Sequence, residues 1–433
     1  MTRRTLRVPE TGRPLWWAAG LGLLLVVIGL PLLAWRLSGA DPAPDPGTSP
    51  EDEPAAVVLD RGERLGGAGD LLRRLEAGLG TDAAEAVDLG ALADPEDDAA
   101  RTRLEALVVA ARELGVREVG LRFVTEEPGF VDERPSTWVG AVALDYVQAG
   151  AQVRFETVMR FADTADGVRF VAAGSTVDPE VGRTPSWWSE PLTVRQEGRT
   201  TVLAPDEERA SILLGQARVA VTQVNRVLPK WRGPLVLEMP ATAAALETAL
   251  GAAPGSYGGI AAVTTTISED AGAPVHILLH PEVFGGLGDG AAQVVATHEA
   301  AHVALGATRT SAPLWLLEGV ADHVALRDSD LPVTEAAGQY LERVREDGLP
   351  TTLPTEADFD ARQAGLGATY EAAWLACRLI VETYGEDALL DLYRAADEGV
   401  PVPVAFRRVL GTTEEAFVAA WRDDLRRLAD LTG

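Results

Sequence analysis

The histidines of this chain are concentrated in one short part of it. All five lie between residues 276 and 323 of a 433-residue sequence, and two of them form the segment HEAAH. Its surroundings, GAAQVVATHEAAHVALG, are typical of a helix that Gly306 ends. Because residues four apart share a helix face, His298 and His302 can present imidazole nitrogens to one ion at about 2.0–2.1 Å. Glu299 lies slightly aside, within reach of a metal-bound water without being a ligand.

A hydrolytic zinc site needs a third protein ligand and an open position for water. The extended metzincin pattern requires a glycine three residues after the second histidine and a third histidine three residues beyond it. Leu305 and Thr308 occupy these two positions. The sequence therefore excludes that subclass, and a third ligand must come from another segment.

The segment APLWLLEGVADHVALR, which follows a polar turn after Gly306, offers that ligand. Pro313 suits the first turn of a returning helix. Glu318 would then lie about 7.5 Å back along this helix, against about 6 Å from His302 to Gly306, so antiparallel packing brings its carboxylate level with the two histidines. Asp322, one turn further on the same face, is expected to accept a hydrogen bond from the outer nitrogen of a ligand histidine and to fix its tautomer.

HEAAH followed by P-x-W-x-x-E-G-x-A-D resembles the gluzincins, the thermolysin-like clan of zinc metallopeptidases, and specifically its compact peptidase-MA-like members. The resemblance covers about residues 205–433. It implies a zincin-type domain that binds one zinc ion through His298, His302 and Glu318, with Glu299 as the general base. The interval between His302 and Glu318 is shorter than in thermolysin-like enzymes and suits a tight helical hairpin.

The resemblance also implies an activity, the hydrolysis of peptide bonds by an endo- or exopeptidase. Zinc lowers the pKa of bound water toward about 7 and polarises the substrate carbonyl. Glu299 takes the proton as the water attacks, then passes it to the leaving amine. Gluzincins often use Tyr or His to stabilise the oxyanion; Tyr370 is the first candidate, followed by His323 and Tyr257. His323 lies five positions after Glu318 and is expected to face elsewhere.

Two other functions stay open. A non-catalytic binding or interaction protein would carry its function in the upstream half and keep a structural or vestigial metal site, although such a site needs no base like Glu299. A zinc hydrolase acting on something other than a peptide is the second alternative. Zinc itself is expected from the family and from the ligand set.

Three more residues with reactive or ligand-type side chains can be interpreted as either functional or purely structural. His276 and His280 share one face of a predicted strand. One of them borders the substrate cleft if IAAVTTTIS or PVHILLHP is the edge strand that a peptide extends in gluzincins; otherwise both are partly exposed polar residues. Cys377 is predicted to be a small buried apolar residue. As the only cysteine, it excludes an intramolecular disulfide and a cysteine-rich metal site.

Residues 59–203 are predicted to form an upstream α+β domain. Helical spacing marks residues 65–114. Strands follow, and LTVRQEGRTTVL indicates a hairpin that turns at Glu197 and Gly198. This order resembles the nuclear-transport-factor-like cone fold over about residues 60–195, a fold with a curved sheet. No catalytic combination of residue types occurs here, so no chemistry is predicted; Trp187 and Trp188 either line a pocket or pack in the core.

Residues 204–433 are predicted to form the metallopeptidase domain. A long helix, PDEERASILLGQARVAVTQVNRVL, begins it with acids in its first turn. Short strands follow, and after residue 288 the pattern is helical almost to the end. Strands first and helices later in one segment predict an α+β arrangement with a mostly helical C-terminal half.

The N-terminal residues indicate a membrane anchor. Residues 15–35 carry no charge and, as a helix, would span about 31 Å, close to the hydrocarbon thickness of a bilayer. Arginines before this stretch and acids after it predict a cytoplasmic tail over 1–14 and an anchor over 15–37. The protein would then cross the plasma membrane once, with its bulk outside. A signal peptide cleaved near residues 38–40 is the alternative, and it also leaves the bulk outside.

The acidic net charge of the chain limits the classes of partner that we expect. A formal net charge of −27 argues against a nucleic-acid binder, which needs a basic face. Residues 38–58 are predicted to be an acidic, proline-rich linker. The acid excess of residues 41–100 suits solubility and repulsion from anionic lipid, and a site for basic partners is the alternative. The expected partners are a peptide or protein substrate and, through the anchor, the membrane; a protein partner of the upstream domain is unknown.

Overall fold

The computed structural model describes residues 57–79, 88–130, 134–178, 182–268, 272–360 and 365–430. The predicted cytoplasmic tail, the anchor and most of the linker lie outside these residues. Among the described helices, none has both the length and the apolar character needed to cross a membrane. Helices and strands are mixed along the described chain, which confirms the predicted α+β class.

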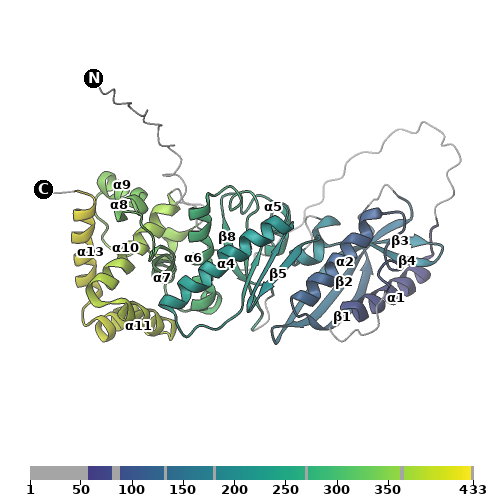
Figure 1. Cartoon of the computed structure of the whole chain (residues 1–433), viewed down its shortest axis with the longest axis horizontal. Coiled ribbons are helices and arrows are strands. Elements are labelled where there is room, and N and C mark those ends of the chain that lie inside the picture. The colour runs from purple at the N-terminus through teal and green to yellow at the C-terminus, as the bar shows by residue number, and fades with distance from the viewer. Residues whose placement is uncertain are drawn as a thin grey trace, which may run out of the picture. The chain divides into compact units, whose positions relative to one another are not determined.

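The described residues divide into two compact units. One comprises residues 57–286 and 296–309 and contains both β-sheets. The other comprises residues 287–295 and 310–430 and is built from helices. Figure 1 labels many of the elements and colours the chain from purple at its N-terminus to yellow at its C-terminus.

The first sheet is an antiparallel meander in the order β1-β2-β3-β4. Two helices precede it, as predicted. The second of them is capped by Asp97, whose carboxylate accepts a hydrogen bond from the backbone N–H of Ala99. The bounds are α1 (Arg61–Leu79), α2 (Asp98–Glu113), β1 (Arg117–Glu126), β2 (Thr137–Gln148), β3 (Ala151–Thr164) and β4 (Gly167–Ala173).

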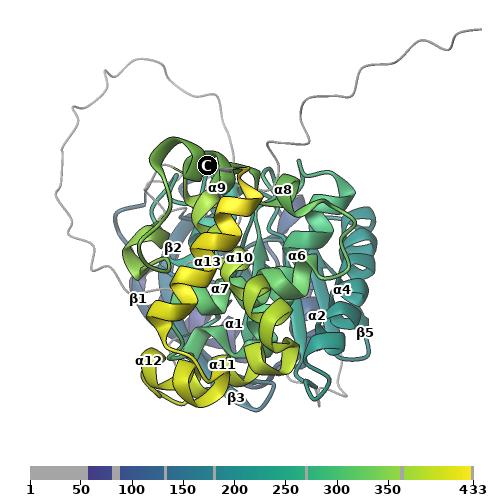
Figure 2. The ribbon, with the colours of Figure 1, turned by 90° about the vertical axis from the view of Figure 1, so that its left-hand side faces the viewer.

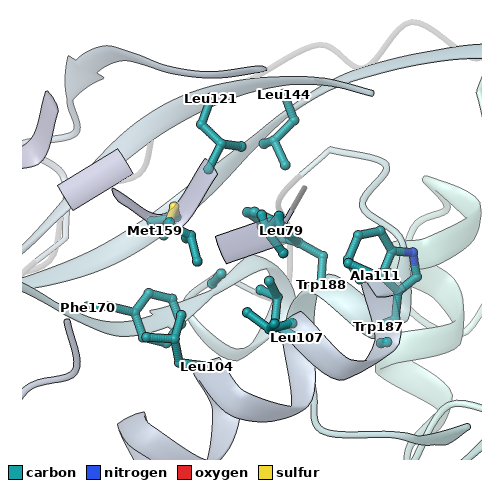
Figure 3. Close-up of a cluster of buried hydrophobic side chains, with 14 of the residues drawn as sticks. Leu79, Leu104, Leu107, Ala111, Leu121, Leu144, Met159, Phe170, Trp187 and Trp188 are labelled. Atoms are coloured by element: carbon teal, nitrogen blue, oxygen red, sulfur yellow. The ribbon is translucent and has the colours of Figure 1, made fainter. Parts of the chain in front are cut away.

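The core of this part lies between the two helices and the sheet. Figure 3 shows Leu104 and Leu107 of α2 close to Phe170, with apolar side chains of the strands beyond them. Trp187 and Trp188, on the short helix α3 (Ser186–Ser189), are buried in the same core. Their ring centroids are 5.8 Å apart in an edge-to-face arrangement. The two tryptophans therefore pack, as the structural alternative predicted.

The predicted hairpin is present, but it belongs to the second sheet. β5 (Thr193–Glu197) and β6 (Thr200–Ala204) pair across a turn in which Gly198 has a φ of 61°. β6 also pairs in parallel with β7 (Leu235–Glu238). Every residue of β6 is buried, so the strand is covered on both faces and paired on both edges. Grouping this hairpin with the upstream strands was wrong, because sequence neighbours do not reveal the second partner of a strand.

The second sheet has the order β5-β6-β7-β9-β8. Its last two strands, β8 (Ala262–Thr266) and β9 (Val275–Leu279), are antiparallel and confirm the predicted strands in IAAVTTTIS and PVHILLHP. β8 is an edge strand, whereas β9 is an inner one. The predicted long helix is α4 (Glu207–Val227), capped by Asp206, and α5 (Ala243–Leu250) follows β7.

The chain after residue 288 is almost entirely helical, as predicted. The long helix α10 packs against α7, α9, α11 and α13, and Figure 2 shows these helices around it. The helices of this stretch are α6 (Asp289–Leu305), α7 (Leu314–Leu326), α8 (Val333–Ala336), α9 (Gly338–Asp347), α10 (Leu366–Tyr384), α11 (Glu386–Asp397), α12 (Val402–Ala405) and α13 (Glu414–Leu428). Short helical turns are η2 (Gly174–Thr176), η3 (Ala307–Arg309), η4 (Glu356–Phe359) and η5 (Phe406–Leu410).

Candidate metal centre

The HEAAH segment lies in the last two turns of α6. Gly306, with a φ of 72°, follows the helix in the left-handed conformation that glycine adopts most easily. The turn η3 comes next, and Pro313 immediately precedes α7. The predicted sequence of helix, glycine stop, turn and second helix is therefore confirmed.

Three predicted ligands come together. His298, His302 and Glu318 each offer one ligand atom, and these atoms all lie within 4.8 Å of one another. The two Nε2 atoms are 2.8 Å apart, and their tautomers decide which one donates. All three residues are buried, with exposed fractions of 0%, 0% and 1%. This is a group of donors that can hold a metal ion.

The donor set suits zinc. Two imidazole nitrogens and one carboxylate are a common protein ligand set of hydrolytic zinc, with one position left for water. Two nitrogens bound to one tetrahedral ion at about 2.1 Å would be about 3.4 Å apart. The histidine nitrogens, 2.8 Å apart, therefore need to separate by about 0.6 Å to bind one ion. Imidazole and carboxylate together also suit other divalent metals, so the donor set does not identify the ion.

Glu299, the predicted base, is held by a residue that the sequence did not single out. The hydroxyl of Thr264, on the edge strand β8, donates a hydrogen bond of 2.6 Å to Glu299 Oε2. Both side chains are buried, with exposed fractions of 0% for Glu299 and 1% for Thr264. In the sequence, Thr264 is one of three consecutive threonines more than thirty residues upstream. The only sequence signal is that successive strand residues point to opposite faces of a sheet, so Thr264 and Thr265 face different sides.

Gly319, next to the third ligand, is a second residue whose role the sequence did not indicate. A Cβ atom at this position would lie 2.5 Å from the carbonyl oxygen of Ala373 and 2.5 Å from Sγ of Cys377. Gly319 thus allows α7 and α10 to approach closely beside Glu318. Cys377 is fully buried, as predicted, and burial raises the pKa of its thiol well above the usual value. The only sequence signal was a glycine inside a helix.

Asp322 is buried on α7, one turn after Glu318. Its charge acts on Glu371, a buried residue of α10 whose Oε2 accepts a hydrogen bond of 2.7 Å from the backbone N–H of Tyr340. Burial raises the pKa of Glu371 to about 7; that hydrogen bond opposes the rise, and the charge of Asp322 adds to it. The predicted hydrogen bond from a ligand histidine to Asp322 stays a prediction.

The three candidates for the oxyanion donor have different surroundings. Tyr370 is buried on α10, with its ring 5.4 Å from that of Phe359, and its catalytic role stays a prediction. His323 contacts Glu386 through Nε2 at 2.9 Å, so it faces α11, as expected. Tyr257 packs beside the apolar cluster of α5 and β9.

Another tyrosine, Tyr393 on α11, responds to the charge of Glu318. Its hydroxyl donates a hydrogen bond of 3.1 Å to Thr310. Burial raises the pKa of Tyr393 to about 12; the bond to Thr310 opposes the rise, and the charges of Asp397 and Glu318 add to it. This neighbour of the third ligand was absent from the sequence candidates because α11 is distant in the chain.

Of the two predictions for the other two histidines, partial exposure was wrong, and a position beside the substrate cleft stays a prediction. His276 and His280 are buried, so they are not partly exposed. They belong to the inner strand β9 and the residue after it, so they do not lie on the edge strand. His276 Nδ1 lies 2.9 Å from Oε2 of Glu238, and His280 Nδ1 accepts hydrogen bonds from two backbone N–H groups. Alternation within β9 was predictable, but the position of the strand in the sheet was not.

Comparison with protein-family models gives no match for this chain, and comparison with curated proteins gives none either.

Proposed function

We propose that this protein is a zinc-dependent peptidase, anchored in the plasma membrane by residues 15–37 with its bulk outside. The observation that carries the proposal is the convergence of His298, His302 and Glu318, with Glu299 one residue from a ligand. A structural metal site has no need of a buried carboxylate beside its ligands. The identity of Glu299 therefore favours a catalytic site over a vestigial one.

In the proposed reaction, the metal supplies Lewis acidity and Glu299 transfers the proton. Zinc bound by the three ligands would supply Lewis acidity, which polarises a carbonyl and makes water acidic enough to react near pH 7. Glu299 accepts the proton of the attacking water and delivers it to the leaving amine. Its burial keeps bulk water from competing for that proton.

The edge strand β8 suits a peptide substrate. Among the described strands it pairs with β9 alone, and strand addition by an extended peptide would use its other edge. Thr264 of this strand contacts the predicted base. A peptide added to β8 would therefore lie next to Glu299, which favours a peptide over the other substrates that a zinc hydrolase accepts.

The experiment combines metal content with hydrolysis. We expect the purified protein to contain about one zinc per chain by mass spectrometry and to cleave an unfolded protein. Glu299→Gln should keep the zinc and lose activity by about 10²–10⁴-fold. Glu335→Gln, an exposed residue of α8, is the matched control.

Stoichiometric zinc without cleavage of any peptide library would contradict the peptidase proposal and favour the non-catalytic binding protein. The anchor is tested separately. The whole chain should sediment with membranes after an alkaline carbonate wash, and a variant lacking residues 1–56 should not.

A further inference from the structure

The hydrogen bond between Thr264 and Glu299 joins two elements that are far apart in the sequence. Thr264 is the central residue of β8, and Glu299 lies in α6. The Oγ1–Oε2 distance of 2.6 Å is short, as expected when a hydroxyl donates to a carboxylate. Both side chains are buried, so the bond lies in a low-dielectric environment, where it is electrostatically stronger than in water.

We propose that Thr264 is a positioning residue that orients the carboxylate of Glu299 for proton transfer. The inference rests on the proposed peptidase function and adds to it a residue outside the HEAAH segment. A glutamate side chain has three rotatable bonds, and a base displaced by about 1 Å can lose about a hundredfold in rate. One hydrogen bond from a fixed donor selects among these conformations.

Thr264 is well suited to be that fixed donor. A β-branched side chain has few χ1 conformations, so its hydroxyl direction is set by the backbone. The backbone is in turn held by antiparallel pairing, in which Thr264 lies opposite Ile277 of β9. The donor is therefore part of the sheet itself, and the acceptor is part of the helix that carries two ligands.

The neighbouring threonine shows that the contact is specific to one face of the strand. Side chains alternate between the two faces of a sheet, so Thr265 points away from the face of Thr264. Its hydroxyl accepts a hydrogen bond of 3.1 Å from Nη2 of Arg183. Two adjacent, buried threonines thus make different contacts, which provides a matched pair of positions for mutation.

The position of Thr264 has a consequence for the substrate. If a peptide pairs with the outer edge of β8, the same strand holds the substrate backbone and the base. The register of the peptide on β8 then sets the distance between its scissile bond and Glu299. One strand would then fix the positions of both the substrate backbone and the Glu299 carboxylate, and proton transfer requires such a fixed distance between them.

The test compares the zinc-loaded wild type with Thr264→Val, Thr264→Ser and Thr265→Val. We expect Thr264→Val to lower kcat by about ten- to a hundredfold. KM, zinc stoichiometry and Tm should stay close to those of Thr265→Val. Thr264→Ser restores the hydroxyl and should recover most of kcat. A loss of activity accompanied by loss of zinc or of folding would indicate a structural role and overturn the inference.

A second measurement does not depend on activity. In crystal structures of the zinc-loaded proteins, the Glu299 carboxylate should change its conformation in Thr264→Val and keep it in Thr265→Val. An unchanged carboxylate, or an unchanged kcat, would overturn the role of Thr264 while leaving the peptidase proposal intact. If the wild type cleaves no peptide, the peptidase proposal fails, and the conformation of Glu299 still decides whether Thr264 orients it.

Discussion

At the scale of single residues, the proposed zinc site depends most on Glu318, because a hydrolytic zinc site needs a third protein ligand besides two histidines. Its ligand atom lies within 4.8 Å of those of His298 and His302. We expect Glu318→Gln to weaken zinc binding by more than about a hundredfold, since even residues that only orient ligands contribute about 10–100-fold. Competition with a chelator measures the affinity, and Glu335→Gln is the control. Unchanged affinity in Glu318→Gln would mean that the third ligand is another residue.

The raised pKa of Glu371 predicts a dependence of stability on pH. Its pKa is about 7 in the folded protein, mainly through burial, against an ordinary value of 4.5. Between these values the folded state binds more protons here than the unfolded state, so the free energy of unfolding falls as pH rises. The loss attributable to Glu371 is on the order of 2 kcal/mol. Urea denaturation at pH 5 and pH 7.5 measures it.

Glu371→Gln should remove this part of the pH dependence, because glutamine keeps an acceptor for the N–H of Tyr340 but does not titrate. The remaining slope would include Glu190, whose pKa burial raises to about 7 as well. The same slope in Glu371→Gln and the wild type would show that Glu371 does not titrate in this range.

The site residues differ in how far the sequence could predict them. The two histidines and Glu299 follow from the spacing within one helix, and Glu318 follows from a short helical hairpin. Thr264 and Gly319 could not be predicted, because their roles depend on a strand and a helix that are distant in the chain. Local periodicity carries no information about such partners.

At the scale of elements, the contact between α7 and α10 depends on the absence of a side chain at Gly319. A Cβ there would be 2.5 Å from the backbone carbonyl oxygen of Ala373, which cannot rotate away. We expect Gly319→Ala to force the helices apart and to cost about 1–3 kcal/mol in the free energy of unfolding. Zinc affinity should fall as well, because Glu318 precedes the displaced residue.

Gly338 in α9 provides the control for this prediction. A Cβ at Gly338 would have nothing within 4 Å, so Gly338→Ala should be neutral or stabilise the protein by about 0.4–1 kcal/mol. Thermal denaturation with and without zinc compares the two variants. Equal stability and zinc affinity in both would show that α7 and α10 adjust without consequence for the site.

Most elements were predictable from apolar spacing, caps and turns. The helix after Asp206 and the hairpin at Gly198 are local structures, and both occur where expected. The membership of that hairpin in a sheet was not predictable. β6 pairs with β7, and the whole of α4 lies between these two strands in the sequence. The buried residues of β6, three of them β-branched, would suit a strand of either sheet.

At the scale of the whole molecule, the upstream residues and the second sheet share one core. Leu203, Val236 and Ile267, from the second sheet and the segment after β8, belong to the same buried cluster as Leu104 and Trp187. A polar contact accompanies it: Nε2 of Gln148, at the end of β2, lies 3.4 Å from Nε2 of His276. The two sheets therefore depend on one another for burial of apolar surface.

This shared core makes the expected boundary at residues 203 and 204 testable by truncation. A fragment of residues 204–433 would lack β5 and nearly all of β6, so it would expose one edge of β7 and the apolar side chains that the upstream residues cover. We expect it to aggregate or to lack a cooperative thermal transition, because an exposed strand edge beside apolar surface promotes association. A fragment of residues 57–433 keeps both sheets and should melt cooperatively and bind zinc. If residues 204–433 alone fold and bind zinc with the same affinity, the predicted metallopeptidase domain is independent, and the shared core contributes little to its stability.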